Sequence, residues 1–269
     1  MKITASIVIY NDEPKIFERA ILSFLNACNG DIFIIDNSEH DIQSKYFGHS
    51  RVKYFKTNKN LGFGKGHNFA LNKIRHNSDL HFFINPDIYF DGVINEIASI
   101  FKKNKDFGVL MPKILYPDGS IQDLCKLLPT PMDLILRRFI KIPFLRKIFH
   151  TNYVLKNIDE STFSEIPSLS GCFLAAPTML LKNIGGFDER YFLYMEDIDL
   201  VRRIGKEFKT IYYPNLEVIH EYKKGSYTNK KLLMLHIKSA IAYFNKHGWI
   251  FDKYRSSKNK EVLSKIVKK

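Results

Sequence analysis

Four short apolar runs in the first half of the chain constrain its fold more than any other feature. They lie at residues 3–10, 32–35, 52–55 and 80–84. Amphipathic patterns that predict helices lie among them, at residues 14–27, 67–74 and 92–103. Strands of continuous apolar residues are buried on both faces, which is typical of parallel sheets with helical crossovers. The sequence therefore predicts an α/β fold in which a mostly parallel sheet is covered by helices.

The second half has a less regular pattern. A turn at Pro117-Asp118-Gly119 separates two short strands. Further strands are predicted at residues 169–176, 210–213 and 218–219. A Lys-rich tail from Lys253 onward is expected to be frayed or to lie on the surface. Because the sequence contains no internal repeat and no low-complexity linker, we expect one continuous domain with an insertion.

The charge balance indicates anionic partners. The 269 residues include 41 Lys and Arg against 28 Asp and Glu, a formal net charge of +13. Such an excess is typical of proteins that meet nucleic acid, acidic lipid head groups or phosphorylated substrates.

The cysteines and the apolar stretches indicate the cellular compartment of the protein. Cys28, Cys125 and Cys172 form no CxxC pair, which argues against a zinc site or a disulfide framework and favours a reducing compartment. The N-terminal apolar run is too short for a signal peptide, and no stretch approaches the length of a transmembrane helix. We therefore expect a cytoplasmic protein that can still touch a membrane.

The stretch Gly186–Leu200 carries the strongest chemical signal. Aromatic residues alternate along it, then Glu196, Asp197 and Asp199 follow within four positions, and an amphipathic helical pattern begins. Acids are favoured in the first turn of a helix by its dipole and its unpaired amides. A carboxylate there is held on a rigid element and faces whatever lies above the helix end. An ordinary capped helix is the alternative.

Polar side chains follow three of the predicted strands. The Asp36 carboxylate could accept a hydrogen bond from the ring N–H of a uracil or thymine base. Asp87, in the Asn85-Pro86-Asp87 turn, suits Mg²⁺, which is held by one or two carboxylates plus substrate phosphates. His220 is a candidate second contact to the metal or phosphate. In each case a structural residue satisfied by local hydrogen bonds is the alternative.

A glycine-rich stretch, Gly62–Gly66, lies in a predicted loop at residues 58–66. It could bring backbone close to phosphates, but it lacks the GxGxxG spacing of a dinucleotide fold and the Ser or Thr of a P-loop. Asn68, just inside the next helix, is a candidate to brace this loop.

Taken in order, these stretches resemble the inverting, GT-A-type glycosyltransferase family 2, in particular its rhamnosyltransferase-like branch. The resemblance runs from about residue 3 to residue 225. The stretches that carry it are Ser6–Asn11, Ile35–Ser38, Asn60–Asn68, Asn85–Asp87, Pro117–Gly119, Gly185–Leu200 and Val218–His220. No single motif is decisive, but the ordered set is specific.

The resemblance implies roles for individual residues. Asp36 matches the base-binding acid, and Asp87 matches the last acid of the metal-binding DxD motif. Asp197 matches the catalytic base, and His220 matches a late histidine that holds the metal or the diphosphate. The first acid of DxD is Asn85 here, which leaves a single metal carboxylate. The implied cofactor is a divalent cation, Mg²⁺ or Mn²⁺, and the remaining substrate-binding candidates are Tyr10, Asn11, Asn60, Gly62, Lys65, Asn68, Asn85, Asp188 and Glu196. Asp199 and Arg203 are expected to form a helix-face ion pair.

The resemblance also implies an organisation. Residues 1–125 form a Rossmann-like, nucleotide-sugar-binding half, which merges with an acceptor-binding, catalytic half at residues 166–250. A basic and apolar insertion occupies residues 126–165, and residues 251–269 form a basic tail.

The expected function is transfer of a sugar, with rhamnose favoured, from a dTDP- or UDP-sugar donor to a growing cell-surface polysaccharide or lipid-linked glycan. A catalytically silent anion- or nucleic-acid-binding protein of the same fold is one alternative. Nucleic acid is not the expected partner, because the charge gathers in residues 126–150 and in the tail, away from the motifs. A sugar nucleotidyltransferase is the other alternative, but residues 11–14 lack the Gly-rich, basic signature it needs. The oligomeric state is left open.

A membrane surface is a further expected partner. Residues 132–141 and 144–149 mix large apolar residues with Arg and Lys, and Pro143 divides them into two short helical pieces. Interfacial helices have this composition. We therefore expect peripheral attachment to an anionic membrane at the inner face of the cell. An insertion that packs against the domain or a second subunit is the alternative.

Overall fold

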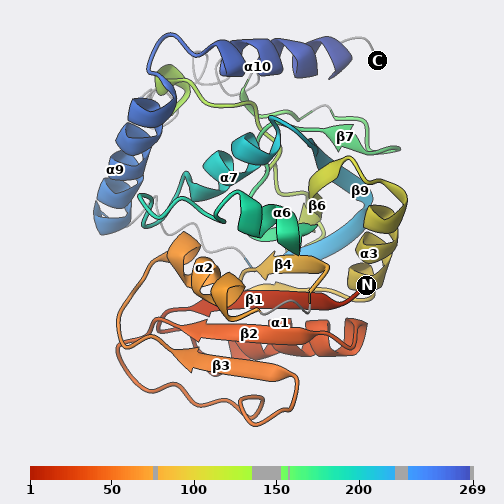
Figure 1. Ribbon diagram of the computed structural model, residues 1–269, viewed down its shortest axis with the longest axis vertical. Coiled ribbons are helices and arrows are strands. Elements are labelled where there is room, and N and C mark those ends of the chain that lie inside the picture. The colour runs from red at the N-terminus through yellow and green to blue at the C-terminus, as the bar shows by residue number, and fades with distance from the viewer. Residues whose placement is uncertain (75–77, 135–152, 157, 222–229, 267–269) are drawn as a thin grey trace.

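The computed structural model describes residues 1–74, 78–134, 153–156, 158–221 and 230–266. A single mixed sheet forms its centre, and helices pack around it (Figure 1). The strands are β1 (Ile3–Ile9), β2 (Asp31–Asp36), β3 (Val52–Lys56), β4 (Leu80–Ile84), β5 (Ile88–Tyr89), β6 (Phe107–Leu115), β7 (Ser164–Glu165), β8 (Phe173–Pro177) and β9 (Lys209–His220). The helices are α1 (Pro14–Ala27), α2 (Phe63–Lys73), α3 (Val93–Lys103), α6 (Thr178–Asn183), α7 (Glu196–Ile204), α9 (Lys230–His247) and α10 (Lys253–Ile266).

The first half of the chain forms the parallel part of the sheet, as predicted. The strands lie in the order β3-β2-β1-β4, and all three pairings are parallel. In this register Ile9 lies opposite Asp36, and Ile7 lies opposite Ile84. The carboxyl ends of β1, β2 and β4 therefore meet at one edge, where ligands of open α/β sheets bind.

The second half continues the same sheet with mixed directions. β8 pairs antiparallel with both β4 and β6, whereas β9 runs parallel to β6 and antiparallel to β5 and β7. The two late strands predicted from the sequence are one strand, β9. Its register against β6 shifts between Pro112 and Lys113, opposite the part of β9 that contains Pro214. A proline donates no ladder hydrogen bond, so it reads as a strand end in the sequence although the strand continues beyond a bulge.

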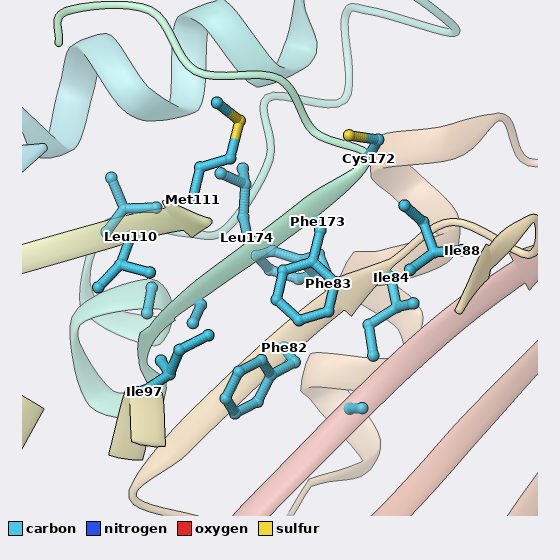
Figure 2. Packing of buried hydrophobic residues seen from close by; sticks show 14 of the residues in the cluster. Phe82, Phe83, Ile84, Ile88, Ile97, Leu110, Met111, Cys172, Phe173 and Leu174 are labelled. Atoms are coloured by element: carbon cyan, nitrogen blue, oxygen red, sulfur yellow. The ribbon is translucent and has the colours of Figure 1, made fainter. Parts of the chain in front are cut away.

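One hydrophobic core joins the two halves. Side chains of β4, β6 and β8 interdigitate in it (Figure 2), and the Phe82 and Phe173 rings meet edge to face at 5.9 Å. Ile97 of α3 closes the core on one face of the sheet. The shared core holds the strand ends of both halves in a fixed relation, which positions the site.

Of the two alternatives predicted for the tail, residues 253–266 follow the second, because they form a helix at the surface instead of a frayed end. α9 and α10 form an arm at the left and top of Figure 1. The buried Arg202 guanidinium of α7 donates to both Asp252 oxygens, at 2.6 and 2.7 Å, just before α10. Asn259 exchanges two 2.9 Å hydrogen bonds with the backbone of Leu128, and Val262 is buried in the main core. The lysines of α10 mask these anchoring contacts in the sequence. No helix in the described ranges has the length and apolarity to cross a bilayer.

Candidate active site

Asn85, Asp87 and His220 meet at the carboxyl edge of the sheet. β5 pairs with the end of β9, so that Ile88 lies opposite His220 and the Glu221 N–H donates to the Asp87 carbonyl at 3.0 Å. His220 Nε2 then lies 3.2 Å from Asp87 Oδ1 and 3.4 Å from Asn85 Nδ2. Strand pairing thus brings together three residues that the sequence singled out.

Gln122 fixes the orientation of the His220 ring. Its amide nitrogen donates to the His220 carbonyl at 2.8 Å, and its Oε1 lies 3.0 Å from His220 Nδ1. Because an amide oxygen only accepts, Nδ1 carries a proton, and Nε2 is the nitrogen that faces Asp87. Burial lowers the pKa of His220, but hydrogen bonds to Asp87 and the Cys172 thiol outweigh it and raise the pKa to about 10.

The loop before β8 connects this cluster to Asp197. The Cys172 carbonyl accepts a hydrogen bond from the Asn85 N–H at 2.8 Å, and the adjacent Gly171 N–H donates to Asp197 Oδ2 at 3.0 Å. A Cβ at Gly171 would lie 3.0 Å from the Asp197 Cβ, so a larger residue there would crowd Asp197. Asp197 is half-buried at the start of α7. The predicted metal residues and the predicted base therefore lie on either side of a two-residue segment.

The backbone that leads into Asp197 is strained. Tyr194 and Met195, which precede α7, both have positive φ, 69° and 68°. Left-handed conformations of non-glycine residues cost on the order of 1–2 kcal/mol each and gather at functional sites. α9 holds this segment in place, because Ser239 Oγ donates to the Leu193 carbonyl at 2.8 Å and Met195 packs with Tyr243.

Glu196 is buried directly beside Asp197. Its Oε2 has no hydrogen-bond partner among the described residues, and its Cβ lies close to Gly64 of α2. Burial, followed by repulsion from Asp197, raises the pKa of Glu196 to about 8. Glu196 is therefore largely neutral near pH 7, so the two neighbouring acids have different environments.

Asp36 is fully buried at the end of β2. Its Oδ1 accepts the Ser38 N–H at 2.8 Å, and its Oδ2 accepts the Tyr54 hydroxyl at 2.6 Å. These bonds orient the carboxylate, and each oxygen keeps a further lone pair that could accept from a base. The base-binding role of Asp36 stays a prediction.

Tyr10 and Asn11 follow the neighbouring strand end. Tyr10 is exposed, and its hydroxyl donates to Glu39 Oε1 at 3.1 Å. Asn11 has a φ of 56°, and its N–H donates to Ser38 Oγ at 2.8 Å. Both predicted substrate-binding residues thus lie beside the Asp36–Ser38 turn, on the donor side of the expected site.

Asn60 and Gly62 shape the loop that enters α2. Asn60 Oδ1 accepts the Gly62 N–H at 2.9 Å, and the Gly62 carbonyl accepts from Asn37 Nδ2 at 3.2 Å. Gly62 has a φ of 83°, and a Cβ there would lie 2.2 Å from the Phe192 carbonyl oxygen. These contacts tie the β2 end to the segment before α7. They give both residues a structural role that the sequence did not show.

The glycine-rich stretch is helical, which corrects the predicted loop at residues 58–66. α2 begins at Phe63 rather than at about His67. A Cβ on Gly64 would lie 2.9 Å from the Phe187 Cβ, and one on Gly66 would lie 2.8 Å from a Val8 methyl. The glycines let the helix approach the sheet closely, so their backbone is not arranged as a phosphate loop.

The side chains of Lys65 and Asn68 both bind other groups of the protein. Lys65 Nζ pairs with Glu189 at 2.9 Å. Asn68 is buried, and its amide exchanges two hydrogen bonds with the Phe187 backbone, at 2.8 and 2.9 Å. Asn68 therefore braces the segment before α7, and its substrate-binding role stays a prediction.

Asp188 also lies apart from the Asp87–His220–Asp197 arrangement. It pairs with Arg190 at 2.9 Å and with Lys246 of α9 at 2.7 Å. Lys246 in turn contacts Asp199, which forms the predicted i,i+4 ion pair with Arg203 at 2.7 Å. Asp188 therefore takes part in the ion-pair cluster between α7 and α9, and its predicted substrate-binding role stays a prediction.

Sequence reasoning missed Gln122, Gly171 and Cys172. Gln122 lies just after the Pro117-Asp118-Gly119 turn, and Gly171-Cys172 directly precedes β8. The available sequence signal for these site residues was a polar or small residue next to a strand end. That signal is not sufficient, because long-range strand pairing decides which strand ends lie together at the site.

The donor set at the strand ends suits a hard cation that takes most of its ligands from a diphosphate. Asp87 supplies a carboxylate, and His220 would supply its Nε2 nitrogen once a cation displaces the proton that Nε2 shares with Asp87, with the Asn85 amide beside them. Within the described part of the chain, no three acidic, histidine or cysteine side chains gather as a metal-binding group. That sparse set matches a cation held mainly by substrate phosphates.

Comparison with known proteins gives relatives along most of the chain. No family model matches it. N-acetylglucosaminyl-diphospho-decaprenol L-rhamnosyltransferase of Mycobacterium tuberculosis is 27% identical over 260 residues, covering 90% of this chain and 84% of the relative. Rhamnosyltransferase WbbL of Escherichia coli is 25% identical over 252 residues, covering 88% and 91%.

Solved structures show the fold class. S. aureus TarS 1-349 in complex with UDP-GlcNAc aligns with a TM-score of 0.58 at 14% identity, over 99% of this chain and 72% of that TarS fragment. GalNAc-T7 with UDP, GalNAc and Mn²⁺ aligns with a TM-score of 0.61 at 14% identity, over 82% of this chain. The match covers 43% of GalNAc-T7, so the chain spans less than half of that structure. The chain has the GT-A fold of glycosyltransferases. Its resemblance to the rhamnosyltransferases among them, expected from the motifs, is confirmed.

Proposed function

We propose that the chain is a metal-dependent, inverting glycosyltransferase whose donor diphosphate binds at Asp87 and His220 and whose base is Asp197. One observation carries this proposal. The short Gly171-Cys172 segment contacts both sides, through the Asn85 N–H and through Asp197 Oδ2. The leaving-group residues and the carboxylate therefore adjoin the same short segment, which supports a single displacement at this place.

The chemistry of each side follows from its groups. Asp87 and His220 would hold a divalent cation, which neutralises charge on the leaving diphosphate. Asp197 accepts the proton of the acceptor hydroxyl while the oxygen of that hydroxyl bonds to the sugar C1. The bond from C1 to the diphosphate oxygen breaks on the opposite face, so the configuration at C1 inverts and the nucleoside diphosphate leaves.

Glu196 is the less suitable base of the pair. Burial keeps its carboxyl largely protonated near pH 7, and a protonated acid accepts no proton. Asp197 is the more exposed of the two and lies at the start of α7, with backbone N–H groups on both of its oxygens. Both oxygens of Asp197 are thus held in a fixed orientation.

The relatives support a substrate class. The two relatives described above are named rhamnosyltransferases, and one name specifies a diphospho-decaprenol-linked N-acetylglucosamine. A dTDP- or UDP-sugar donor, with rhamnose favoured, and a lipid-linked or cell-surface glycan acceptor are the proposed substrates. Asp36 would accept from the N3–H of the uracil or thymine base. Such an acceptor would place the enzyme in the cytoplasm, against the inner face of the membrane.

Calorimetry with UDP and dTDP, each with and without Mn²⁺, tests the donor site. Asp87→Ala should weaken Mn²⁺-dependent nucleotide binding by roughly 10-fold or more, because it removes the one metal carboxylate. Asp106→Ala is the control. Asp106 directly precedes the start of β6, at the other edge of the sheet from the candidate site, and forms an exposed ion pair with Lys209. Unchanged binding in Asp87→Ala would contradict the proposal.

A further inference from the structure

The turn between α9 and α10 presents large apolar residues to solvent. Trp249, Ile250 and Phe251 are 43%, 78% and 92% exposed. Burial of such side chains is strongly favourable, so three consecutive exposed ones indicate a surface that has a partner.

The turn is held rigidly in this exposed position. The buried Arg255 guanidinium donates to the Gly248, Trp249 and Ile250 carbonyls, at 3.4, 3.3 and 3.0 Å. Asp252, the next residue, is anchored on Arg202. The backbone is therefore tied down from inside while the apolar side chains point outward.

The outer face of α9 continues this surface. Met234, Lys238 and Ile241 are exposed at helical spacing, and the stripe leads through Asn245 to Trp249. Trp249 Nε1 donates to Asn245 Oδ1 at 2.8 Å. The sequence has no Asp or Glu from residue 222 to residue 251. The face thus combines apolar side chains with positive charge.

We propose that this docking face binds the surface of an anionic lipid bilayer. Its residues are Met234, Lys238, Ile241, Trp249, Ile250 and Phe251, with Lys230 and Lys253 exposed at either end. Interfacial segments combine aromatic and aliphatic residues with Lys in this way, and anionic head groups attract the lysines. A second copy of the chain would bring the same lysines against each other without an acid to pair them, so charge complementarity favours lipid.

The inner side of α9 links the docking face to the candidate active site. Ser239 binds the Leu193 carbonyl, and Tyr243 and Phe244 pack against Met195, directly before Glu196 and Asp197. Resting on the proposed function, this arrangement would hold the base close to a lipid-linked acceptor at the bilayer surface. The docking face is separate from the insertion that the sequence predicts to bind membrane. Residues 135–141 and 144–149 of that insertion lie outside the described residues.

The chain supplies its own probe, because Trp249 is its single tryptophan. Vesicles containing phosphatidylglycerol should shift the Trp249 emission to shorter wavelength, and brominated acyl chains should quench it. Pure phosphatidylcholine vesicles should do neither to a comparable extent. The double variant Ile250→Ser/Phe251→Ser keeps Trp249, so its binding can be followed by the same signal. Its affinity for the anionic vesicles should fall about 10-fold or more.

Charge variants test the electrostatic part. Lys230→Glu/Lys238→Glu/Lys253→Glu should weaken binding on the order of 100-fold, since each lysine near an anionic surface contributes about a factor of 5. The matched control is Lys102→Glu/Lys103→Glu/Lys105→Glu, at the end of α3 on the opposite side of Figure 1. Met179→Ser, another exposed methionine, controls for the apolar changes.

An emission unchanged by anionic vesicles would overturn the proposal, as would equal losses in the control variants. A shift that appears without lipid and grows with protein concentration would show self-association instead. Nucleotide binding is measured separately on the same variants. Vesicle binding by a protein that binds no nucleotide would refute the proposed function and leave the docking face intact.

Discussion

Replacing Glu196 by Gln should remove a pH dependence of stability that the structure makes large. Glu196 is buried and its Oε2 has no hydrogen-bond partner in the part of the chain that the structure describes, and the charged form is penalised further by Asp197. Gln has nearly the same shape but does not titrate. The variant therefore isolates the cost of ionising this one carboxyl.

The sign and size follow from the pKa of Glu196, raised from 4.5 to about 8. Between these values the folded state holds more protons than the unfolded state, so the free energy of unfolding falls as pH rises. The stability is fully present below pH 4.5 and is lost as pH rises through about 8. At 1.36 kcal/mol per pKa unit, the whole shift of about 3.5 units corresponds to about 5 kcal/mol. Water entering the site would reduce this, so we expect at least about 2 kcal/mol between pH 5 and pH 9.

Urea unfolding at several pH values measures the effect. The quantity of interest is the free-energy difference between wild type and Glu196→Gln, which should move in favour of the variant as pH rises. Glu207→Gln, at an exposed position after α7, should give a difference that does not change with pH. Parallel wild-type and Glu196→Gln curves would refute the reasoning, because they would mean that Glu196 is ionised in the folded protein throughout.

Two further predictions concern packing and anchoring. Gly66→Ala should destabilise the fold by about 1–3 kcal/mol, since its Cβ would lie 2.8 Å from a Val8 methyl, whereas Gly48→Ala, which meets open space, should be close to neutral in urea unfolding. Arg202→Ala should cost about 3–5 kcal/mol in the same assay, because it leaves Asp252 buried without its bidentate partner, and a loss below about 1 kcal/mol would contradict that role.

The parallel half of the fold could be predicted because its signal is local. Continuous apolar runs alternate with helical patterns, and the observed strands β1 to β4 follow those runs within a few residues. The start of α2 was missed for a physical reason. Gly64 and Gly66 lower helix propensity, and only their close contacts with Phe187 and Val8 explain why they are helical.

The second half could not be derived in the same way because long-range contacts determine it. β8 lies between β4 and β6, although it comes later in the chain than both. α9 has a weakly amphipathic sequence and is held by hydrogen bonds of Ser239 to the Leu193 carbonyl and of Tyr243 to Arg202. None of these pairings leaves a periodic trace in the sequence.

The candidate site also combines residues that local sequence signals identified with residues whose surroundings depend on long-range contacts. Asp87, His220 and Asp197 stand out in the sequence because each follows a strand or starts a helix, and the structure brings them together. Lys65, Asn68 and Asp188 have equally suggestive positions, but protein partners already occupy their polar groups. Which polar side chains stay available depends on neighbours that only the folded chain supplies.

Single-turnover transfer from a bound nucleotide-sugar tests the central claim, that Asp197 is the base. The comparison is between wild type, Asp197→Asn and Glu196→Gln, with donor binding measured on the same samples. An Asn at position 197 can still accept the Gly171 N–H, so its donor binding should be unchanged, while transfer should fall about 10²–10⁴-fold. An active Asp197→Asn beside an inactive Glu196→Gln would contradict the account and reverse the roles of the two acids.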